Sequence, residues 1–330
     1  MPRTPPILGR PSSRTFVRRV LTLAVVSGWL SAGTPAAAYV RARTDVTQSP
    51  YFWSDPRRIL ELATPPDGIG ISSDDLRKAA GTALRSWSQP AIECTDVLLQ
   101  LAESAVSDQS AKRDGHNRIV VRTDAWCRDP VLMTNCHDSS QVALTTWFVL
   151  NNPGVENDGQ ILEADIELNA VDYAFAMIPD GTINARDYLD HYDLTSALTH
   201  EAGHFIGLAH NCRGSNDPLF LDDLGLVAPE CTSSAAQKSV ILGATMYPKI
   251  NPVDVGERTL TVDDAKAPCD IYPRGSLPPD RWIGSLNCAV ASPVEAGSGN
   301  GAATRYRGET ILCALGIAFG IARRRSRRRR

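Results

Sequence analysis

The order of His200, Glu201, His204, Gly207 and His210 constrains this 330-residue chain more than any other feature of its sequence. His200 and His204 are four residues apart, so on a helix they project from one face, one turn apart. Gly207 can take the left-handed conformation that lets a chain leave a helix sharply. That exit would bring His210 back beside the first two histidines. The sequence therefore predicts a helix that ends near Gly207 and three imidazoles that meet at one point.

Three neutral imidazoles with a fourth position left open are the ligands of a catalytic zinc site, whereas a structural site has four protein ligands. We therefore predict a catalytic Zn²⁺ held by His200, His204 and His210. Glu201 can reach a water on that metal without being a ligand, which suits a general base. One alternative is an ordinary amphipathic helix that carries histidines. Another is a zinc site without catalysis, which would be free to lose Glu201.

Charge is distributed unevenly along the chain. Residues 1–38 hold five arginines and no acid, and residues 323–330 hold seven arginines and no acid. Taking these 12 from the 34 basic residues leaves 22 against 37 acidic ones, so residues 39–322 carry a net charge near −15. This charge repels nucleic acid, and we expect no nucleic-acid partner.

The N-terminus has the organisation of an export signal. An arginine pair precedes an apolar stretch from Val20 to about Leu30, and Ala36–Ala38 form a small-residue cleavage pattern. We interpret residues 1–38 as a signal peptide and Tyr39 as the first mature residue. The alternative is an N-terminal membrane anchor. The arginine pair also permits a twin-arginine export route.

The C-terminus has three parts. Residues 274–310 are rich in Gly, Pro, Ser and Ala, which is typical of a linker. Residues 311–322 are apolar but, as a helix, cover only about 18 Å of a hydrocarbon core of about 30 Å. With the arginines that follow, residues 311–330 resemble a sorting tag of the MYXO-CTERM type, which holds an exported protein until it is cut. A basic tail with a fortuitous apolar patch is the alternative.

No apolar run is long enough for a multi-pass membrane protein. We expect an exported monomer, extracellular or at the cell surface, that contacts the membrane only through its tail before processing.

The cysteines agree with export, because disulfides persist in oxidising compartments. The body of the chain holds six, which allow 15 connectivities. Short loops favour Cys127–Cys136 and Cys212–Cys231, which leaves Cys94–Cys269 by elimination.

The body of the chain has an α+β pattern. Helices are predicted to begin at Ser73, near Asp193 and at Thr261. Ile161–Leu168 alternates apolar and acidic residues, which predicts a strand with one wet side, near a sheet edge. The other predicted strands are 96–101, which reads as buried, 117–123 and 142–150.

The zinc-binding pattern His200 to His210 resembles the consensus of the metzincin metalloproteases. The turn Ala244–Pro248 contains Met246, and its Met-Tyr-Pro order is similar to the matrixin branch. The segment 260–272 likewise resembles the matrixin C-terminal helix. The resemblance covers about residues 45–273.

This resemblance implies that residues 39–273 form a metzincin-like zincin domain. Its mixed twisted sheet and long helices would make upper and lower subdomains that flank an active-site cleft. Met246 would be an apolar floor under the ligands, and Ile161–Leu168 would be the edge strand that pairs with an extended substrate. The implied activity is a zinc endopeptidase acting on protein or peptide substrates. The alternatives are a zinc-binding surface module for assembly or adhesion, and another metzincin branch.

Three departures from the matrixin pattern affect what can be expected. No cysteine precedes Cys94 in the body of the chain, so latency by a propeptide cysteine is not expected. Ile250 stands where matrixins commonly have an aromatic residue in the specificity pocket. A second zinc has no matching pattern, and we interpret the three remaining histidines as surface residues, with Asp138 as a loose candidate partner. These histidines are His116, His137 and His191.

The loop between Cys212 and Cys231 contains three acids that could bind Ca²⁺. The alternative is a solvated acidic loop, which we favour. The acids are Asp217, Asp222 and Asp223.

Overall fold

The computed structural model describes residues 39–276 and 291–296, except residues 130, 181–185 and 235–238. The predicted signal peptide and sorting tag, and most of the predicted linker, lie outside the described residues. Within them, no helix has both the length and the apolar character needed to cross a bilayer.

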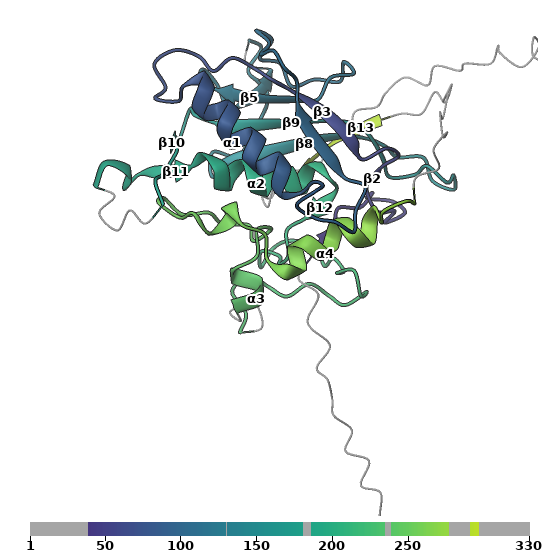
Figure 1. The fold of residues 1–330 in the computed structure, drawn as a ribbon. Coiled ribbons are helices and arrows are strands. Elements are labelled where there is room, and N and C mark those ends of the chain that lie inside the picture. Colours follow the sequence, from purple (N-terminus) through teal and green to yellow (C-terminus); the bar gives the residue numbers. More distant parts are fainter. Residues whose placement is uncertain (1–38, 130, 181–185, 235–238, 277–290, 297–330) are drawn as a thin grey trace, which may run out of the picture. The chain divides into compact units, whose positions relative to one another are not determined.

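A mixed sheet with a parallel centre organises the fold (Figure 1). In the described part of the chain its order is β13-β8-β9-β5-β3-β4, and the short β2 also pairs with β9. The pairs β2–β9, β5–β9, β3–β5 and β3–β4 are parallel, whereas β8–β9 and β13–β8 are antiparallel. The strands are β2 (Phe52–Trp53), β3 (Arg57–Leu62), β4 (Leu98–Leu101), β5 (Arg118–Arg122), β8 (Ala143–Leu150), β9 (Gln160–Asn169) and β13 (Ala291–Ala296).

The predicted strands exist, but two of their positions in the sheet were wrong. β9, expected near the edge, lies between β8 and β5, and β4, which reads as a buried strand, lies at one end of the sheet. The other end of the sheet is antiparallel: β8 pairs with β9, and β13 pairs with the outer side of β8. Residues 291–296 therefore form a strand inside the segment that the sequence predicts as linker.

The acidic face of β9 is covered rather than wet, which explains the error. Glu163, Asp165 and Glu167 are all buried. The Nε atom of Arg122 on β5 donates to Glu167 at 2.6 Å, and the backbone N–H of Arg118 donates to Asp165 at 2.8 Å. Buried carboxyl groups need such hydrogen-bond partners, and for Asp165 and Glu167 they come from β5.

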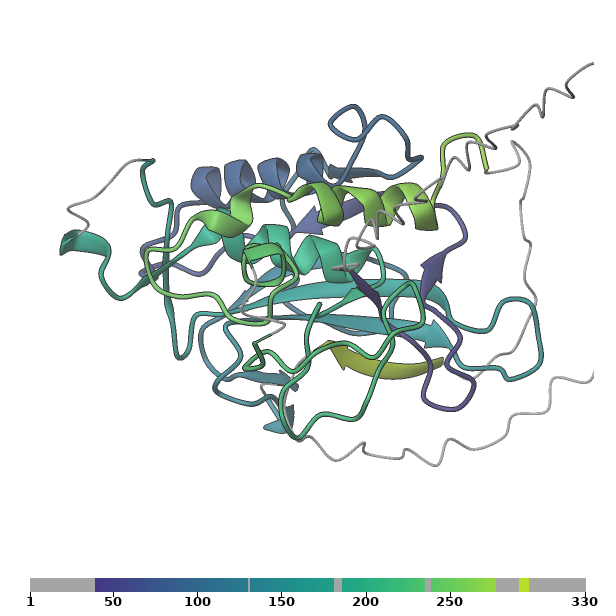
Figure 2. The same ribbon diagram turned by 90° about the horizontal axis from the view of Figure 1, so that it is seen from below.

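The three predicted helices form, each starting within one residue of its predicted position. Ser72, one residue before the predicted position, caps α1 (Ser73–Ser86), and Asp193 caps α2 (Leu194–Phe205). Thr261 and Asp264 form a capping box at α4 (Val262–Ile271). α1 and α2 lie side by side over one face of the sheet (Figures 1 and 2).

α2 is the central element of the core. All of its residues except His200 are buried, so it packs on every side rather than along one stripe. The core cluster joins it to the buried alanine and leucine face of α1 and to the strands. A helix held on all sides is a rigid base for the side chains at its end.

The disulfide pairing predicted from the sequence is confirmed: the described residues contain Cys94–Cys269, Cys127–Cys136 and Cys212–Cys231. The first attaches α4 to the loop before β4. The second closes the hairpin of β6 (Cys127–Asp129) and β7 (Thr134–Cys136). The bonds fit an oxidising environment.

The remaining short elements are β1 (Val40–Arg41), β10 (Ala174–Ala176), η1 (Arg186–Tyr188), β11 (His191–Asp193), β12 (Leu208–Ala209), α3 (Ser239–Leu242) and η2 (Gly256–Arg258).

Candidate metal centre

The chain leaves α2 through Gly207, as the sequence predicts. Gly207 has φ 97°, and a Cβ there would lie 2.9 Å from the carbonyl oxygen of Tyr51. Both the backbone conformation and the close approach therefore favour glycine. β12 follows Gly207 and pairs antiparallel with β1. His210 comes directly after β12, so this pairing fixes where His210 lies.

The three histidines meet at one point. The Nε2 atom of His210 lies 3.2 Å from the Nε2 atoms of both His200 and His204. The Nδ1 atom of His200 lies 2.7 Å from the carbonyl oxygen of Thr245, and Nδ1 of His204 lies 2.8 Å from that of Leu208. A carbonyl oxygen can only accept, so both Nδ1 atoms carry the proton and both Nε2 lone pairs face His210.

This arrangement fits a zinc ion. The lone pairs of His200 and His204 both face the Nε2 atom of His210. A proton on that atom could bond to only one of them, whereas a cation between the rings can interact with all three. Tetrahedral ligands with Zn–N bonds of about 2.0–2.1 Å lie about 3.3–3.4 Å apart, close to the observed separations. The carbonyl partners of the Nδ1 atoms are the outer-shell groups that orient zinc-binding imidazoles. In the described part of the chain, the group of side chains that could hold a metal ion consists of these three histidines.

Burial keeps the imidazoles neutral. It lowers the pKa of His210 to about 3, with a smaller contribution from His200, and it lowers the pKa of His204 well below its ordinary value. The pKa of His200 is lowered as well, again chiefly by burial. Neutral imidazole is the form that ligates metals.

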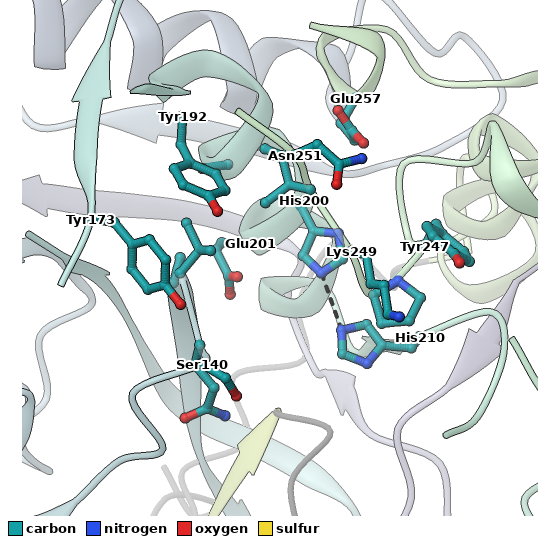
Figure 3. Close-up of a pocket in the computed structure, with 16 residues that line it drawn as sticks. Ser140, Tyr173, Tyr192, His200, Glu201, His210, Tyr247, Lys249, Asn251 and Glu257 are labelled. Atoms are coloured by element: carbon teal, nitrogen blue, oxygen red, sulfur yellow. Dashed lines mark hydrogen bonds between the residues drawn. The ribbon is translucent and has the colours of Figure 1, made fainter. Parts of the chain in front are cut away.

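Glu201 lies in the same cavity as His200 and His210, and Figure 3 shows all three side chains there. The hydroxyl of Thr145 on β8 donates to its carboxylate at 2.6 Å. Burial raises the pKa of Glu201 to about 8, and the hydrogen bond from Thr145 opposes that shift. A carboxylate in such surroundings is a stronger base than one in water.

The carbonyls at the C-terminal end of α2 have buried side-chain donors. The last carbonyls of any helix lack intrahelical partners. Here the indole N–H of Trp53 donates to Phe205 at 2.7 Å, and that of Trp147 donates to His204 at 2.8 Å. The Tyr272 hydroxyl donates to the next carbonyl, that of Ile206, at 2.8 Å. These aromatic donors fix the helix end that carries the ligands.

The turn that contains Met246 lies directly under α2. Met246 is fully buried, and its Cε atom would lie 3.3 Å from a Cβ placed on Gly203. Its neighbour Thr245 offers its carbonyl to His200, and its N–H donates to Asp264 in the capping box of α4 at 2.9 Å. The turn therefore connects α4 to a candidate ligand.

The prediction that the other histidines are surface residues was wrong for His137. Its side chain is buried, 3.8 Å from Glu167, with its ring 4.8 Å from that of Trp126. His116 is half exposed, and its ring lies 2.8 Å from a carboxylate oxygen of Glu61. His191 pairs with Asp190. The three histidines are spread over separate parts of the fold.

The acids of the loop between Cys212 and Cys231 interact with groups of the protein. Asp217 accepts the N–H of Gly214, and Asp222 accepts those of Leu224 and Leu226. Asp223 lies 3.4 Å from Lys266. These contacts account for the acids without Ca²⁺, which stays an untested prediction.

No family model matches the chain, and a search of curated proteins finds no significant match. The interpretation of the centre therefore depends on its geometry. The structure brings the predicted His200, Glu201, His204 and His210 together and packs Met246 against Gly203 of α2. Sequence reasoning missed Thr145, because a single threonine in a strand carries no signal of the side chain it will face.

Proposed function

We propose that this protein is a zinc-dependent endopeptidase with a metzincin-like fold. The observation that carries the proposal is the convergence of three imidazole Nε2 atoms at zinc-like spacing beside a buried glutamate in an accessible cavity. His200, His204 and His210 would hold the ion. When bound, zinc lowers the pKa of water and polarises a carbonyl oxygen.

Glu201 then has two tasks. It takes the proton of the attacking water and later delivers it to the leaving amine, so that one side chain serves as base and acid. The Thr145 hydroxyl holds the carboxylate in place at 2.6 Å. The aromatic donors behind α2 keep the helix end fixed during these proton transfers.

The start of β8, before the residues Thr145–Leu150 that pair with β13, supplies a surface for an extended substrate. Ala143, at the start of β8, lines the cavity together with the segment Tyr247–Asn251 on the other side. A peptide between them can pair its backbone with β8, which is a common mode of peptide recognition. The strand assigned to this role is thus β8, in place of the predicted Ile161–Leu168.

Glu201→Gln tests the proposal. With zinc bound, the parent should hydrolyse casein, and the variant should lose at least about a hundredfold in kcat while its zinc content stays at the parental level. Glu103→Gln, at an exposed glutamate, is the matched control and should keep full activity. A zinc-loaded parent that cleaves neither casein nor any member of a peptide library would contradict the proposal and favour the surface-module alternative.

A further inference from the structure

The cavity at the metal centre extends to an acidic residue that the proposed chemistry does not use. Its volume is about 220 Å³. Its lining includes the rings of Tyr173 and Tyr192 and, beyond His200, Asn251 and Glu257 (Figure 3). A substrate whose scissile bond lay at the metal ligands would place a neighbouring side chain in this cavity, because His200 and His210 line it.

Glu257 lies in η2, which packs against α2, and it is only 8% exposed. Its Oε2 atom has no hydrogen-bond partner in the described part of the chain. The adjacent Arg258 does not neutralise it, because that guanidinium pairs with Asp193 and Asp180. Burial raises the pKa of Glu257 to about 7, and the negative charges of Asp254 and Asp193 raise it further.

A buried carboxylate without a cation is costly, and a cationic ligand would remove the cost. Lys249 also lines the cavity, but its side chain is exposed to solvent, whereas Glu257 is enclosed. Charges act more strongly in the enclosed part, where the dielectric constant is lower. The cavity is therefore suited to a long apolar stem with a positive end.

We propose that Glu257 selects substrates with a lysine or arginine beside the scissile bond. This inference rests on the proposed peptidase function and names its substrate class. A site that pairs with a charged group rejects a neutral isostere by roughly 10- to 100-fold.

A library digest first identifies a cleaved peptide and the position beside its scissile bond. The test then compares two versions of this peptide, one with lysine and one with norleucine at that position. The zinc-loaded parent should prefer lysine by 10-fold or more in kcat/KM. Glu257→Gln should bring the ratio close to one and keep its rate on the norleucine peptide. The control Asp254→Asn removes a neighbouring acid outside the cavity lining and should keep the preference.

The ratio separates selectivity from structural damage, because damage lowers both rates together. This inference alone would be overturned if the enzyme showed no preference for lysine or arginine in the library. It would also be overturned if Glu257→Gln kept the parental ratio of kcat/KM between the lysine and norleucine peptides. A zinc-loaded parent that cleaves no peptide would overturn the proposed function and, with it, this inference.

A separate observation concerns the edge of β8. β13 pairs with it in antiparallel register, from Ala291 opposite Leu150 to Ala296 opposite Thr145 (Figure 2). Thr145 is the residue that donates to Glu201. A segment near the C-terminus thus occupies the strand edge that leads to the proposed catalytic base.

We infer that residues 291–296 compete with extended substrates for β8, an inhibition that also rests on the proposed function. A tethered segment acts at an effective concentration in the millimolar range, so even weak pairing competes with dilute substrate. In an antiparallel pair, alternate residues direct their N–H groups to the partner strand. Pro293 has no N–H, so we expect its neighbours Ser292 and Val294 to donate to β8.

Val294→Pro removes one of these donors, and Glu295→Pro, at a position expected to face outward, is the matched control. At low substrate concentration, Val294→Pro should cleave a short peptide several-fold faster than the parent or control, through a lower KM. Backbone hydrogen exchange at 145–150 should accelerate in the same variant. An active enzyme with equal KM and equal exchange in all three proteins would overturn this inference alone. Absence of hydrolysis in all three, with zinc bound, would overturn the proposed function and the inhibition together.

Discussion

Replacing Gly203 with alanine should destabilise this protein, although alanine is the better helix former. Gly203 lies in α2, on the side that packs against the Met246 turn and α1. A Cβ there would come within 2.8 Å of the Cζ2 atom of Trp87 and 3.3 Å of the Cε atom of Met246. Ordinary carbon contacts are about 3.5–4.0 Å. Trp87 and Met246 are both fully buried, so neither can move aside freely.

The magnitude follows from two opposing effects. Glycine to alanine in a helix interior favours folding by about 1 kcal/mol, whereas overpacking a core costs about 1–3 kcal/mol. The rigid indole favours the upper end of that range. We therefore expect the free energy of unfolding to fall by about 1–2 kcal/mol, measured by urea unfolding with a chelator present so that bound metal adds nothing.

Gly81→Ala in α1 is the matched control. There the Cβ would meet only the flexible end of Arg85, at 3.2 Å, and the side chain of Leu101 at 3.8 Å. This variant should gain about 0.5–1 kcal/mol. If Gly203→Ala stabilised the protein as much as Gly81→Ala, the described contact between α2 and the Met246 turn would be refuted.

Two further predictions concern stability. Burial raises the pKa of Asp165 to about 8, with Glu163 and Glu167 adding to the shift, so the folded protein keeps a proton that the unfolded chain releases near pH 4. Stability from this group is therefore lost as the pH rises from about 4 to 8, and Asp165→Asn should gain on the parent by a few kcal/mol over that range. Urea unfolding at pH 5, 6.5 and 8 measures the difference, and parallel pH profiles would contradict the prediction. Disulfide Cys94–Cys269 spans 175 residues and Cys127–Cys136 spans 9. By chain entropy, replacing the first pair by serine should therefore cost about 2.6 kcal/mol more than replacing the second pair, and equal unfolding midpoints of the two variants would exclude this.

Local chemistry made much of the centre predictable from the sequence. Helical periodicity aligned His200 with His204, and Gly207 marked the exit that returns His210. Asp193 and Thr261 marked the starts of α2 and α4 because a cap residue acts within its own turn. Each of these features depends on residues only a few positions apart.

Features that depend on distant partners were not predictable. The alternation in β9 was correct, but its acids are buried because distant groups bond to them. On β5, the backbone N–H of Arg118 donates to Asp165 and the guanidinium of Arg122 donates to Glu167. His137 is buried for a similar reason, beside Trp126 and Glu167. β13 was missed because a segment rich in Gly, Pro and Ser becomes a strand only when β8 offers it an edge.

X-ray absorption at the zinc edge tests the central claim most directly. The purified protein, together with a metal analysis, should give one zinc per chain with three imidazole nitrogens at about 2.0–2.1 Å and a light-atom fourth ligand from water. His210→Ala should lower the nitrogen count from imidazole by one or abolish binding. Protein that takes up no zinc, or a zinc ion closed by a fourth side chain such as a cysteine sulfur, would contradict the claim that this is an open, catalytic metal centre.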